Sequence, residues 1–299
     1  MSTELYPLTL EPIIAEQFWG RPDSSFYEDG PSSDYTFGTI WMATENSKVG
    51  AGPQTGRNLG YLKQRWGRDL IGSASEDAGD RSFPVELKLK RTGSASLTAA
   101  LNADSLWYVL GAGEGGYLHA GYLPGLNIAA IAERAGGDPA RWADSMPRYQ
   151  VEEGQTLFLP ALAPLILGPG LTMAQISPPA ESPELWPLPG YGEEAVRRAA
   201  ETGSPVWISP RPAKSGLIEI FQSESLQIHL VTSQHFSAVT VQEAATFIWP
   251  LFGQARIRCR GPASTTRLQQ GRITLLPSSL GHYSVESSGA VGYLLIEAF

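Results

Sequence analysis

Two seven-residue stretches, Gly154-Gln-Thr-Leu-Phe-Leu-Pro160 and Gly271-Arg-Ile-Thr-Leu-Leu-Pro277, are near copies of each other and decide the fold. Each has a glycine suited to a turn, a short apolar run typical of a buried strand, and a proline that ends the run. A unit that recurs far along a chain indicates internal duplication. The two stretches therefore predict an all-β protein with one similar barrel in each half.

Other segments also favour strands separated by turns. Short apolar or alternating runs lie at 86–90, 106–110, 156–159, 226–231 and 292–297. Many short strands punctuated by glycine are typical of barrels and sandwiches. The glycine-rich stretch 111–116 follows one of them without a helix start after it, so it predicts a turn between strands and no phosphate-binding loop.

Eight prolines at 178–212 indicate a connection between two halves, which sets the predicted domains at 1–177 and 213–299. A small helical insertion is predicted within the first domain at 126–147. There Asp138-Pro139 favours a helix start that would carry Trp142 and Met146. A short helix is also predicted at 193–201, inside the proline-rich connection, because acidic residues begin it and arginines follow.

Composition excludes several classes of function. The net charge is −8 and no basic patch is present, so nucleic acid is not an expected partner. No apolar run approaches the roughly 20 residues of a membrane span, and the start at Met1 lacks the features of a signal peptide. The single cysteine, Cys259, excludes an internal disulfide. We expect a cytoplasmic protein that is not associated with a membrane.

The repeated stretch resembles the signature of cupin barrels, in which a metal-binding histidine lies five residues beyond the proline. Leu165 stands at that place after the first copy, and His282 after the second. Further segments are similar to type I mannose-6-phosphate isomerase in its short two-cupin form. The matching segments are 6–12, Phe18-Trp19-Gly20, Gly38-Thr39-Ile40-Trp41, Phe83-Pro84 followed by Lys88, 106–110, 123–125 and about 216–299. The resemblance implies two cupin barrels and a family of aldose–ketose isomerases.

The family resemblance also implies a zinc site, made of a Gln-x-His pair, a glutamate and a second histidine. The zinc holds the open-chain sugar phosphate and stabilises charge on the reacting oxygens. In this chain the Gln-x-His pair is replaced by Ala99 and Leu101, or by Ala100 and Asn102 in the alternative register. Ser105 stands at the glutamate position and Leu165 at the second histidine. We therefore expect no metal, no other cofactor and no metal-dependent isomerase activity.

The neighbouring catalytic positions differ from the family as well. Ala103 replaces a lysine, Thr39 replaces a glutamate, and the stretch 175–179 replaces an acidic, arginine-bearing segment. Three functional hypotheses follow from these differences. The first is a non-catalytic protein that binds a sugar or sugar phosphate, or a protein partner. The second is an enzyme of metal-independent chemistry, with Ser105, Thr98, Lys88 and Asp104 as candidate groups. The third is a conventional isomerase, if the alignment is misread.

The predicted ligand site consists of Trp19, Trp41 and Lys88, at the mouth of the first barrel. Tryptophan rings stack on sugar faces, although buried tryptophans also fill cores. Lys88, Lys90 and Arg91 would reach an anionic ligand, but a solvated strand edge is the interpretation that the sequence favours.

The histidines are weaker candidates. We expect His282 to be a hydrogen-bonded residue at a barrel rim, since no His-x-His motif lies on the preceding strands. His229 is expected on a solvent face or with its hydrogen bonds satisfied.

Overall fold

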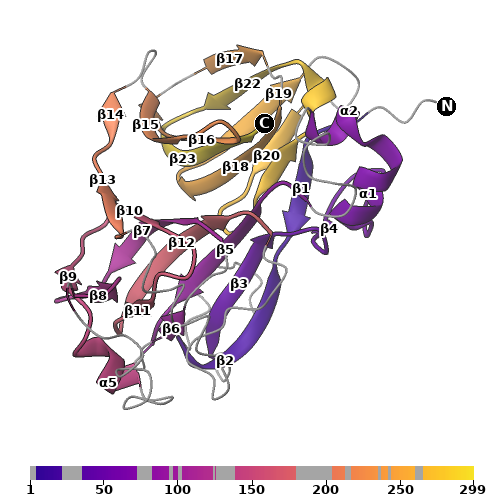
Figure 1. Ribbon diagram of the computed structural model, residues 1–299. Helices are drawn as coiled ribbons and strands as arrows, with labels where there is room; N and C mark the ends of the chain where they lie inside the picture. The colour runs from indigo at the N-terminus through magenta and orange to yellow at the C-terminus, as the bar shows by residue number, and fades with distance from the viewer. Residues whose placement is uncertain are drawn as a thin grey trace.

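The computed structural model is built almost entirely from β-strands (Figure 1). The described residues are 5–21, 36–72, 83–93, 97–99, 103–123, 125, 139–179, 204–212, 217–234, 237–241, 244–259 and 265–299. The predicted helix at 193–201 and most of the helical insertion predicted at 126–147 lie outside these ranges, as do Ala100, Leu101 and Asn102.

The strands fall into two groups along the chain. The first group is β1 (Leu8–Glu11), β2 (Ile13–Arg21), β3 (Phe37–Ala43), β4 (Lys48–Val49), β5 (Glu86–Arg91), β6 (Leu97–Ala99), β7 (Ser105–Ala112), β8 (Tyr117–Ala120), β9 (Arg148–Gln150), β10 (Thr156–Leu159), β11 (Leu165–Leu167) and β12 (Leu171–Ser177). The second group is β13 (Val206–Ile208), β14 (Arg211–Pro212), β15 (Leu217–Gln222), β16 (Leu226–Gln234), β17 (Ser237–Val241), β18 (Ala245–Phe252), β19 (Ala255–Cys259), β20 (Thr265–Leu268), β21 (Thr274–Leu276), β22 (His282–Ser287) and β23 (Ala290–Ala298). All five strands predicted from the sequence lie within this set.

These strands form two large and two small antiparallel sheets. The large sheets have the orders β13-β10-β7-β12-β5-β3-β2 and β14-β15-β16-β23-β18-β21-β1-β4. The small sheets are β6-β11-β8-β9 and β17-β22-β19-β20. A buried apolar cluster joins each large sheet to one small sheet. The molecule therefore consists of two β-sandwiches, and the predicted all-β class is confirmed.

The two sandwiches repeat one strand pattern. When one large sheet is read in reverse, β10, β7, β12, β5 and β3 correspond to β21, β18, β23, β16 and β15. The repeated stretches occupy corresponding places, since they supply β10 and β21. Gly154 and Gly271 both have left-handed backbone, with φ of 89° and 78°. Glycine adopts this conformation without the steric cost that a side chain would bring. The two turns therefore have the same physical origin.

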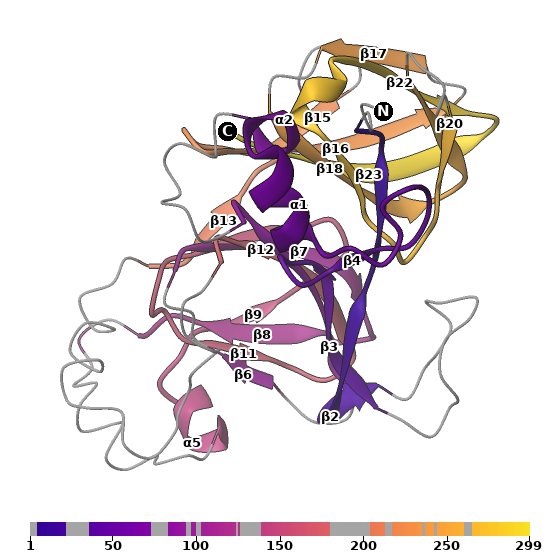
Figure 2. The ribbon, with the colours of Figure 1, turned by 90° about the vertical axis from the view of Figure 1, so that its right-hand side faces the viewer.

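The two halves exchange their first strands. Strand β1, at the start of the chain, pairs with β21 in the second large sheet, with Leu8 opposite Leu275. Strand β13, in the proline-rich connection, pairs with β10 in the first large sheet, with Leu157 opposite Trp207. Both exchanged strands are visible in Figures 1 and 2, where β1 reaches the upper sandwich and β13 the lower one. The domain boundaries predicted at 177 and 213 stay a prediction, but sheet pairing crosses them twice.

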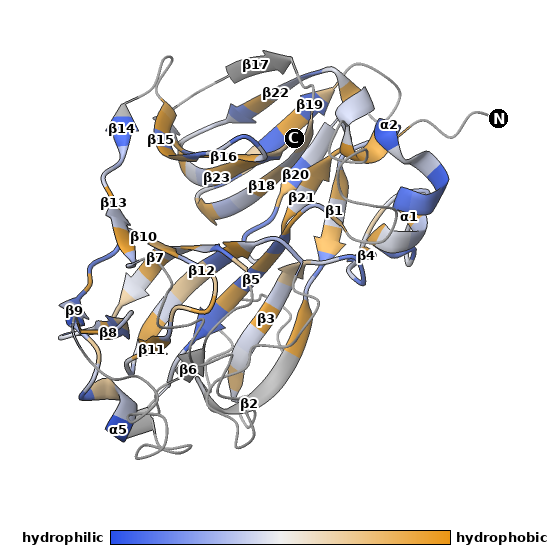
Figure 3. Cartoon of the chain, in the orientation of Figure 1, coloured by the Kyte–Doolittle hydropathy of each residue, from blue (hydrophilic) through white to orange (hydrophobic). Residues whose placement is uncertain are grey.

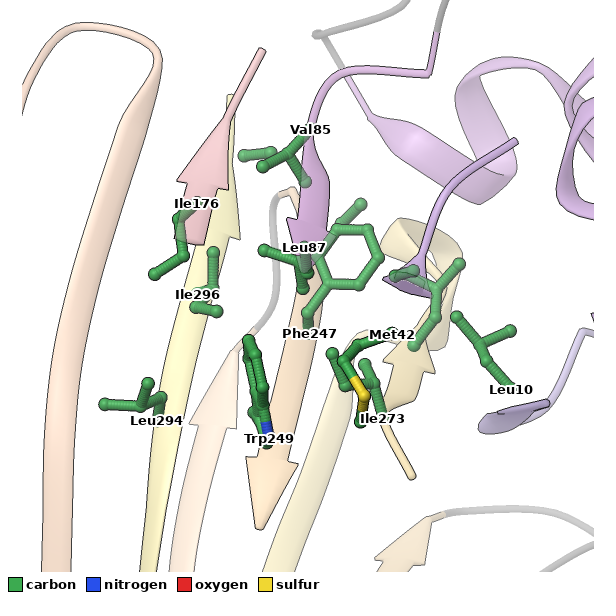
Figure 4. Packing of buried hydrophobic residues seen from close by; sticks show 14 of the residues in the cluster. Leu10, Met42, Val85, Leu87, Ile176, Phe247, Trp249, Ile273, Leu294 and Ile296 are labelled. Atoms are coloured by element: carbon green, nitrogen blue, oxygen red, sulfur yellow. The ribbon is translucent and has the colours of Figure 1, made fainter. Parts of the chain in front are cut away.

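The largest buried cluster lies between the two sandwiches. Leu87 and Ile176 from the first large sheet meet Phe247, Trp249 and Ile296 from the second (Figure 4). Successive side chains along a strand point to opposite faces of a sheet, and in each large sheet both faces carry apolar residues. One face packs inside its own sandwich and the other packs against the second sandwich (Figure 3 shows the apolar strands).

Three short helices, α1 (Leu59–Trp66), α2 (Arg68–Ile71) and α5 (Pro139–Ala143), are described. Helix α5 begins at Pro139, as the sequence predicts, but it ends at Ala143 and so carries Trp142 and not Met146. Both residues are buried in one apolar cluster with Ile166. Helices α1 and α2 were not predicted from the sequence. Asn58 begins α1 with a side-chain cap, accepting a hydrogen bond from the Tyr61 backbone N–H at 2.8 Å. No helix in the described part of the chain has the length and hydropathy that a membrane span requires.

Candidate functional site

A row of four side chains crosses the inner face of the first large sheet. Trp41 on β3 lies opposite Lys88 on β5, which lies opposite Gln175 on β12, which lies opposite Trp107 on β7. Residues directly opposite in antiparallel strands point to the same face of a sheet. Trp107 belongs to the cluster inside the first sandwich, so the whole row faces that interior. We call these four residues the inner row.

The cations of β5 are buried. Lys88 is 6% exposed and Lys90 is 1% exposed, and β5 lies inside the sheet, between β12 and β3. The expectation of a solvated strand edge is therefore wrong. Lys88 Nζ lies 3.1 Å from Glu86 Oε2, and Lys90 Nζ donates to Thr39 Oγ1 at 2.9 Å. Alternation places Arg91 on the opposite face from Lys88 and Lys90, so Arg91 is not part of the inner face.

Gln175 is a buried polar residue that was not among the predicted site residues. Its side chain is fully buried, and neither its amide nitrogen nor its amide oxygen has a hydrogen-bond partner among the described residues. An unsatisfied buried amide costs about 1–3 kcal/mol in proteins. Such a cost is accepted where a group serves a ligand, so Gln175 beside Lys88 makes the inner row a candidate binding site. Only the register of β12 against β5 reveals this neighbourhood.

The predicted zinc positions do not fit a metal. Leu165 is completely buried in the apolar cluster of the first sandwich and lies opposite Ala99 in the β11–β6 pairing. The Ser105 hydroxyl accepts a hydrogen bond from Trp107 Nε1 at 2.9 Å and donates to the Leu159 carbonyl at 3.5 Å. Leucine and alanine side chains offer no ligand atoms, whereas zinc needs nitrogen, sulfur or oxygen donors. Within the described ranges, no three His, Cys, Asp or Glu side chains are grouped to hold a metal ion.

The structure places two of the three predicted ligand-site residues side by side. Trp41 and Lys88 are cross-strand neighbours, and Trp41 is half-buried. Trp19 lies in β2, which borders β3, but its side chain is outside the described part of the structure. Whether these residues bind a ligand stays a prediction.

The groups proposed for metal-independent catalysis do not come together. Asp104 is exposed and accepts a hydrogen bond from the Ala161 backbone N–H at 2.8 Å, while the neighbouring Ser105 is buried. Strands β7 and β5 are separated by β12, which places the backbones of Ser105 and Lys88 about 10 Å apart. Thr98 lies opposite Ile166, on a strand of the small sheet.

The histidines differ from expectation in one case. His282 begins β22 and is exposed, at the place that corresponds to Leu165 at the start of β11. His229 is only 6% exposed, and its Nδ1 has no hydrogen-bond partner in the described structure. The expectation of a solvent-facing or satisfied histidine is therefore wrong for His229. Burial lowers the pKa of its imidazole, and Glu219 partly opposes that effect.

Comparison with solved structures places this arrangement in a known fold, that of two-cupin isomerases. Mannose 6-phosphate isomerase from Bacillus subtilis superposes with a TM-score of 0.78 at 17% sequence identity, covering 97% of this chain and 99% of that one. Apo mannose 6-phosphate isomerase from Salmonella typhimurium gives a TM-score of 0.72 at 10% identity, covering 99% of this chain and 100% of that one. No protein-family model and no curated protein sequence matches the chain. The structural likeness at these identities establishes the fold.

Proposed function

We propose that the chain binds a sugar phosphate in its first sandwich and lacks the metal-dependent isomerase activity of the proteins whose fold it shares. One observation carries this proposal. The unpartnered amide of Gln175 lies beside a buried lysine, Lys88, in a sandwich that has hydrocarbon at the expected zinc positions. The polar part of a ligand site is present, and the metal-binding part is replaced.

The loss of isomerase activity follows from the residues at the metal positions. An aldose–ketose isomerase must stabilise negative charge on the sugar oxygens and move a proton between adjacent carbons. Leu165 and Ala99 supply neither a metal ligand nor a charged group for this task. Ser105 is engaged by Trp107 and the Leu159 carbonyl. In this proposal the chain therefore binds its ligand without converting it.

Recognition of a sugar phosphate would depend on three residues of the inner row, Lys88, Gln175 and Trp41. Lys88 supplies a cation that attracts a phosphate, and burial strengthens that attraction relative to water. The Gln175 amide offers a donor and an acceptor to sugar hydroxyls, and the Trp41 ring offers an apolar face. Without a metal to hold the sugar, we expect weak binding, at about millimolar dissociation constant or about 4 kcal/mol.

Calorimetric titration with mannose 6-phosphate tests the binding. Wild type should bind, and Lys88→Met should weaken binding about tenfold or more, because the methionine keeps the apolar stem and removes the charge. Lys48→Met is the matched control, since Lys48 is exposed on β4 and lies outside the inner row. If wild type fails to bind, or if the two variants lose affinity equally, the first sandwich has no such site and a protein-partner role becomes the better hypothesis.

A separate assay tests the absence of isomerisation. Purified protein with added zinc should show no interconversion of mannose 6-phosphate and fructose 6-phosphate above a heat-inactivated control. Turnover that requires zinc would show that the metal positions were misassigned and would overturn this part of the proposal. The binding result and the activity result are independent, so each part can fail without the other.

A further inference from the structure

The segment 244–285 is unusually basic for this chain. It contains five arginines and no aspartate or glutamate, although the whole chain has a net charge of −8. Residues 213–299 hold six lysine or arginine residues and five aspartate or glutamate residues, whereas residues 1–212 hold 16 and 25 of them. The negative net charge therefore belongs entirely to residues 1–212, and the second sandwich is weakly positive.

Strand pairing gathers three of these arginines on the outer face of the small sheet β17-β22-β19-β20. Arg256 and Arg258 lie two residues apart on β19, and Arg256 lies opposite Arg267 on β20. Their neighbours Ile257 and Leu268 are buried inside the second sandwich, so the arginines point outward, and all three are exposed. We call these three residues the arginine face. The expectation that no basic patch is present is wrong for this face.

The arginine face borders an edge strand. In the described structure β20 lies at the end of its sheet and pairs with β19 alone. An edge strand presents backbone N–H and C=O groups to which another extended segment can bond. Strand β20 contains no proline or glycine that would interrupt such bonding. Like charges directly opposite each other destabilise a strand pair and opposite charges stabilise it, so Arg267 favours an acidic strand at this edge.

One carboxylate already lies against the arginine face. Glu286 on β22 lies opposite Arg256, and Glu286 Oε2 lies 3.4 Å from Arg258 Nη2. The Arg258 side chain remains 63% exposed in this ion pair. Exposed ion pairs contribute little to stability, so a carboxylate from a partner can replace Glu286 beside Arg258 at small cost.

We propose that the arginine face and the edge of β20 bind an extended acidic segment of a partner protein, which adds to the small sheet as a further strand. Side chains on one face of such a strand recur every second residue. A carboxylate opposite Arg267 lies next to Arg256, and a carboxylate opposite Thr265 lies next to Arg258. Guanidinium groups bind carboxylates through paired hydrogen bonds. The segment that fits therefore has acidic residues at alternate positions and neutral residues between them.

The same observations disfavour other anionic partners. Among the described residues, this outer face has no phenylalanine, tyrosine or tryptophan on which the bases of a single-stranded nucleic acid would stack. A long polyanion or an anionic membrane would also meet the field of residues 1–212, whose excess of acidic residues repels it. A short acidic segment contacts the arginine face alone, and the proposal is therefore limited to such a segment.

Fluorescence anisotropy with a labelled peptide of alternating glutamate and threonine tests the proposal on the whole chain. Wild type should bind this peptide at low ionic strength and should bind its glutamine–threonine counterpart about tenfold more weakly or less, because the charges are removed. A peptide with all its glutamates before its threonines keeps the same charge and should bind about threefold more weakly. No binding of the alternating peptide, or equal binding of the alternating and segregated peptides, would overturn the proposal.

Two double variants locate the binding. Arg256→Gln combined with Arg267→Gln should weaken binding of the alternating peptide about tenfold. Arg57→Gln combined with Arg65→Gln is the matched control, because these two arginines at α1 are exposed and their loss changes the net charge by the same amount. Equal weakening by the two double variants would show attraction without a site and would refute the arginine face.

Glu286→Gln is expected to act in the opposite direction. The substitution removes the carboxylate that competes for Arg258, so binding of the alternating peptide should strengthen about twofold to threefold. Weaker binding in this variant would contradict the assigned role of Arg258. An oligothymidylate or vesicles containing phosphatidylserine should bind wild type less tightly than the peptide does. Tighter binding of either probe would replace the acidic segment with a nucleic acid or a membrane as the partner.

Discussion

Leu165 and His282 occupy corresponding places after the two repeated stretches, yet they lie in different environments. Each residue begins a strand of a small sheet, β11 or β22. Leu165 is completely buried against the core of its sandwich, whereas His282 is exposed. The same backbone position therefore tolerates hydrocarbon or imidazole, and the local packing decides which one is stable. A single residue at this place says little about function until its exposure is known.

Gln175 allows a prediction about a single residue. Gln175→Leu should raise the free energy of unfolding by about 1 kcal/mol, because it replaces an unsatisfied buried amide with hydrocarbon. The same variant should bind mannose 6-phosphate more weakly. Urea unfolding and calorimetry measure the two effects. Gln155→Leu is the control, because Gln155 Oε1 accepts from the Glu152 backbone N–H at 3.0 Å, and its loss should lower stability. A Gln175→Leu protein less stable than wild type would contradict this account.

The burial of Lys88 could not be predicted from the sequence alone. Alternation in β5 correctly predicts a strand with Leu87 and Leu89 on one face and the lysines on the other. Alternation does not say whether the polar face meets solvent, and lysines are rarely fully buried. The answer depends on β12 and β3 flanking β5, which is a matter of long-range pairing. For the same reason, the sequence does not show that Gln175 lies beside Lys88.

At the scale of elements, the cap of α1 is a testable source of stability. The Asn58 side chain accepts a hydrogen bond from the Tyr61 N–H, and Leu59 and Leu62 bury the helix against the central core. Asn58→Ala should lower the free energy of unfolding by about 1 kcal/mol. Asn58→Asp keeps the acceptor and should stay close to wild type in the same urea titration. Equal loss in both variants would mean that the cap is not the cause.

The turn before β10 allows a second prediction for an element. Gly154 has φ of 89°, and an added Cβ would meet only Tyr108 Oη, at 4.0 Å. Gly154→Ala should therefore cost about 1–2 kcal/mol through backbone strain alone, without a clash. Gly289→Ala is the control, because Gly289 does not have a positive φ and its added Cβ would meet nothing within 4 Å. Thermal unfolding of the pair should separate them, and similar midpoints would rule out the strain.

Elements were predictable where one local pattern is strong. The repeated stretches predicted β10 and β21 because the glycine, the apolar run and the proline act together. Helix α1 was missed since it is short and contains Gly60, which lowers helix propensity. Its start signal at Asn58 is present in the sequence, but the helix is stabilised mainly by contacts of Leu59 and Leu62 with distant strands.

The whole molecule joins its two sandwiches by strand exchange and by a shared core. Strands β1 and β13 each complete the large sheet of the other half, and Phe83 from the first half meets Phe247 edge-on, with ring centroids 5.9 Å apart. An apolar interface of this kind couples domains more firmly than the polar contacts usual between domains. Neither half keeps its complete large sheet without the other. The two sandwiches should therefore fold as one cooperative unit.

Val285 tests this coupling because it lies in the core of the second sandwich, away from the shared core. Val285→Ala should lower the free energy of unfolding by about 2 kcal/mol. If the molecule unfolds as one unit, hydrogen exchange in 157–159 of the first sandwich should lose the same protection as exchange in β22. Val206→Ala is the matched control, because Val206 is 53% exposed on β13 and its truncation should change stability by less than about 0.5 kcal/mol. Loss of protection confined to the second sandwich would show that the halves unfold separately, and strand exchange would then align the sandwiches without coupling their stability.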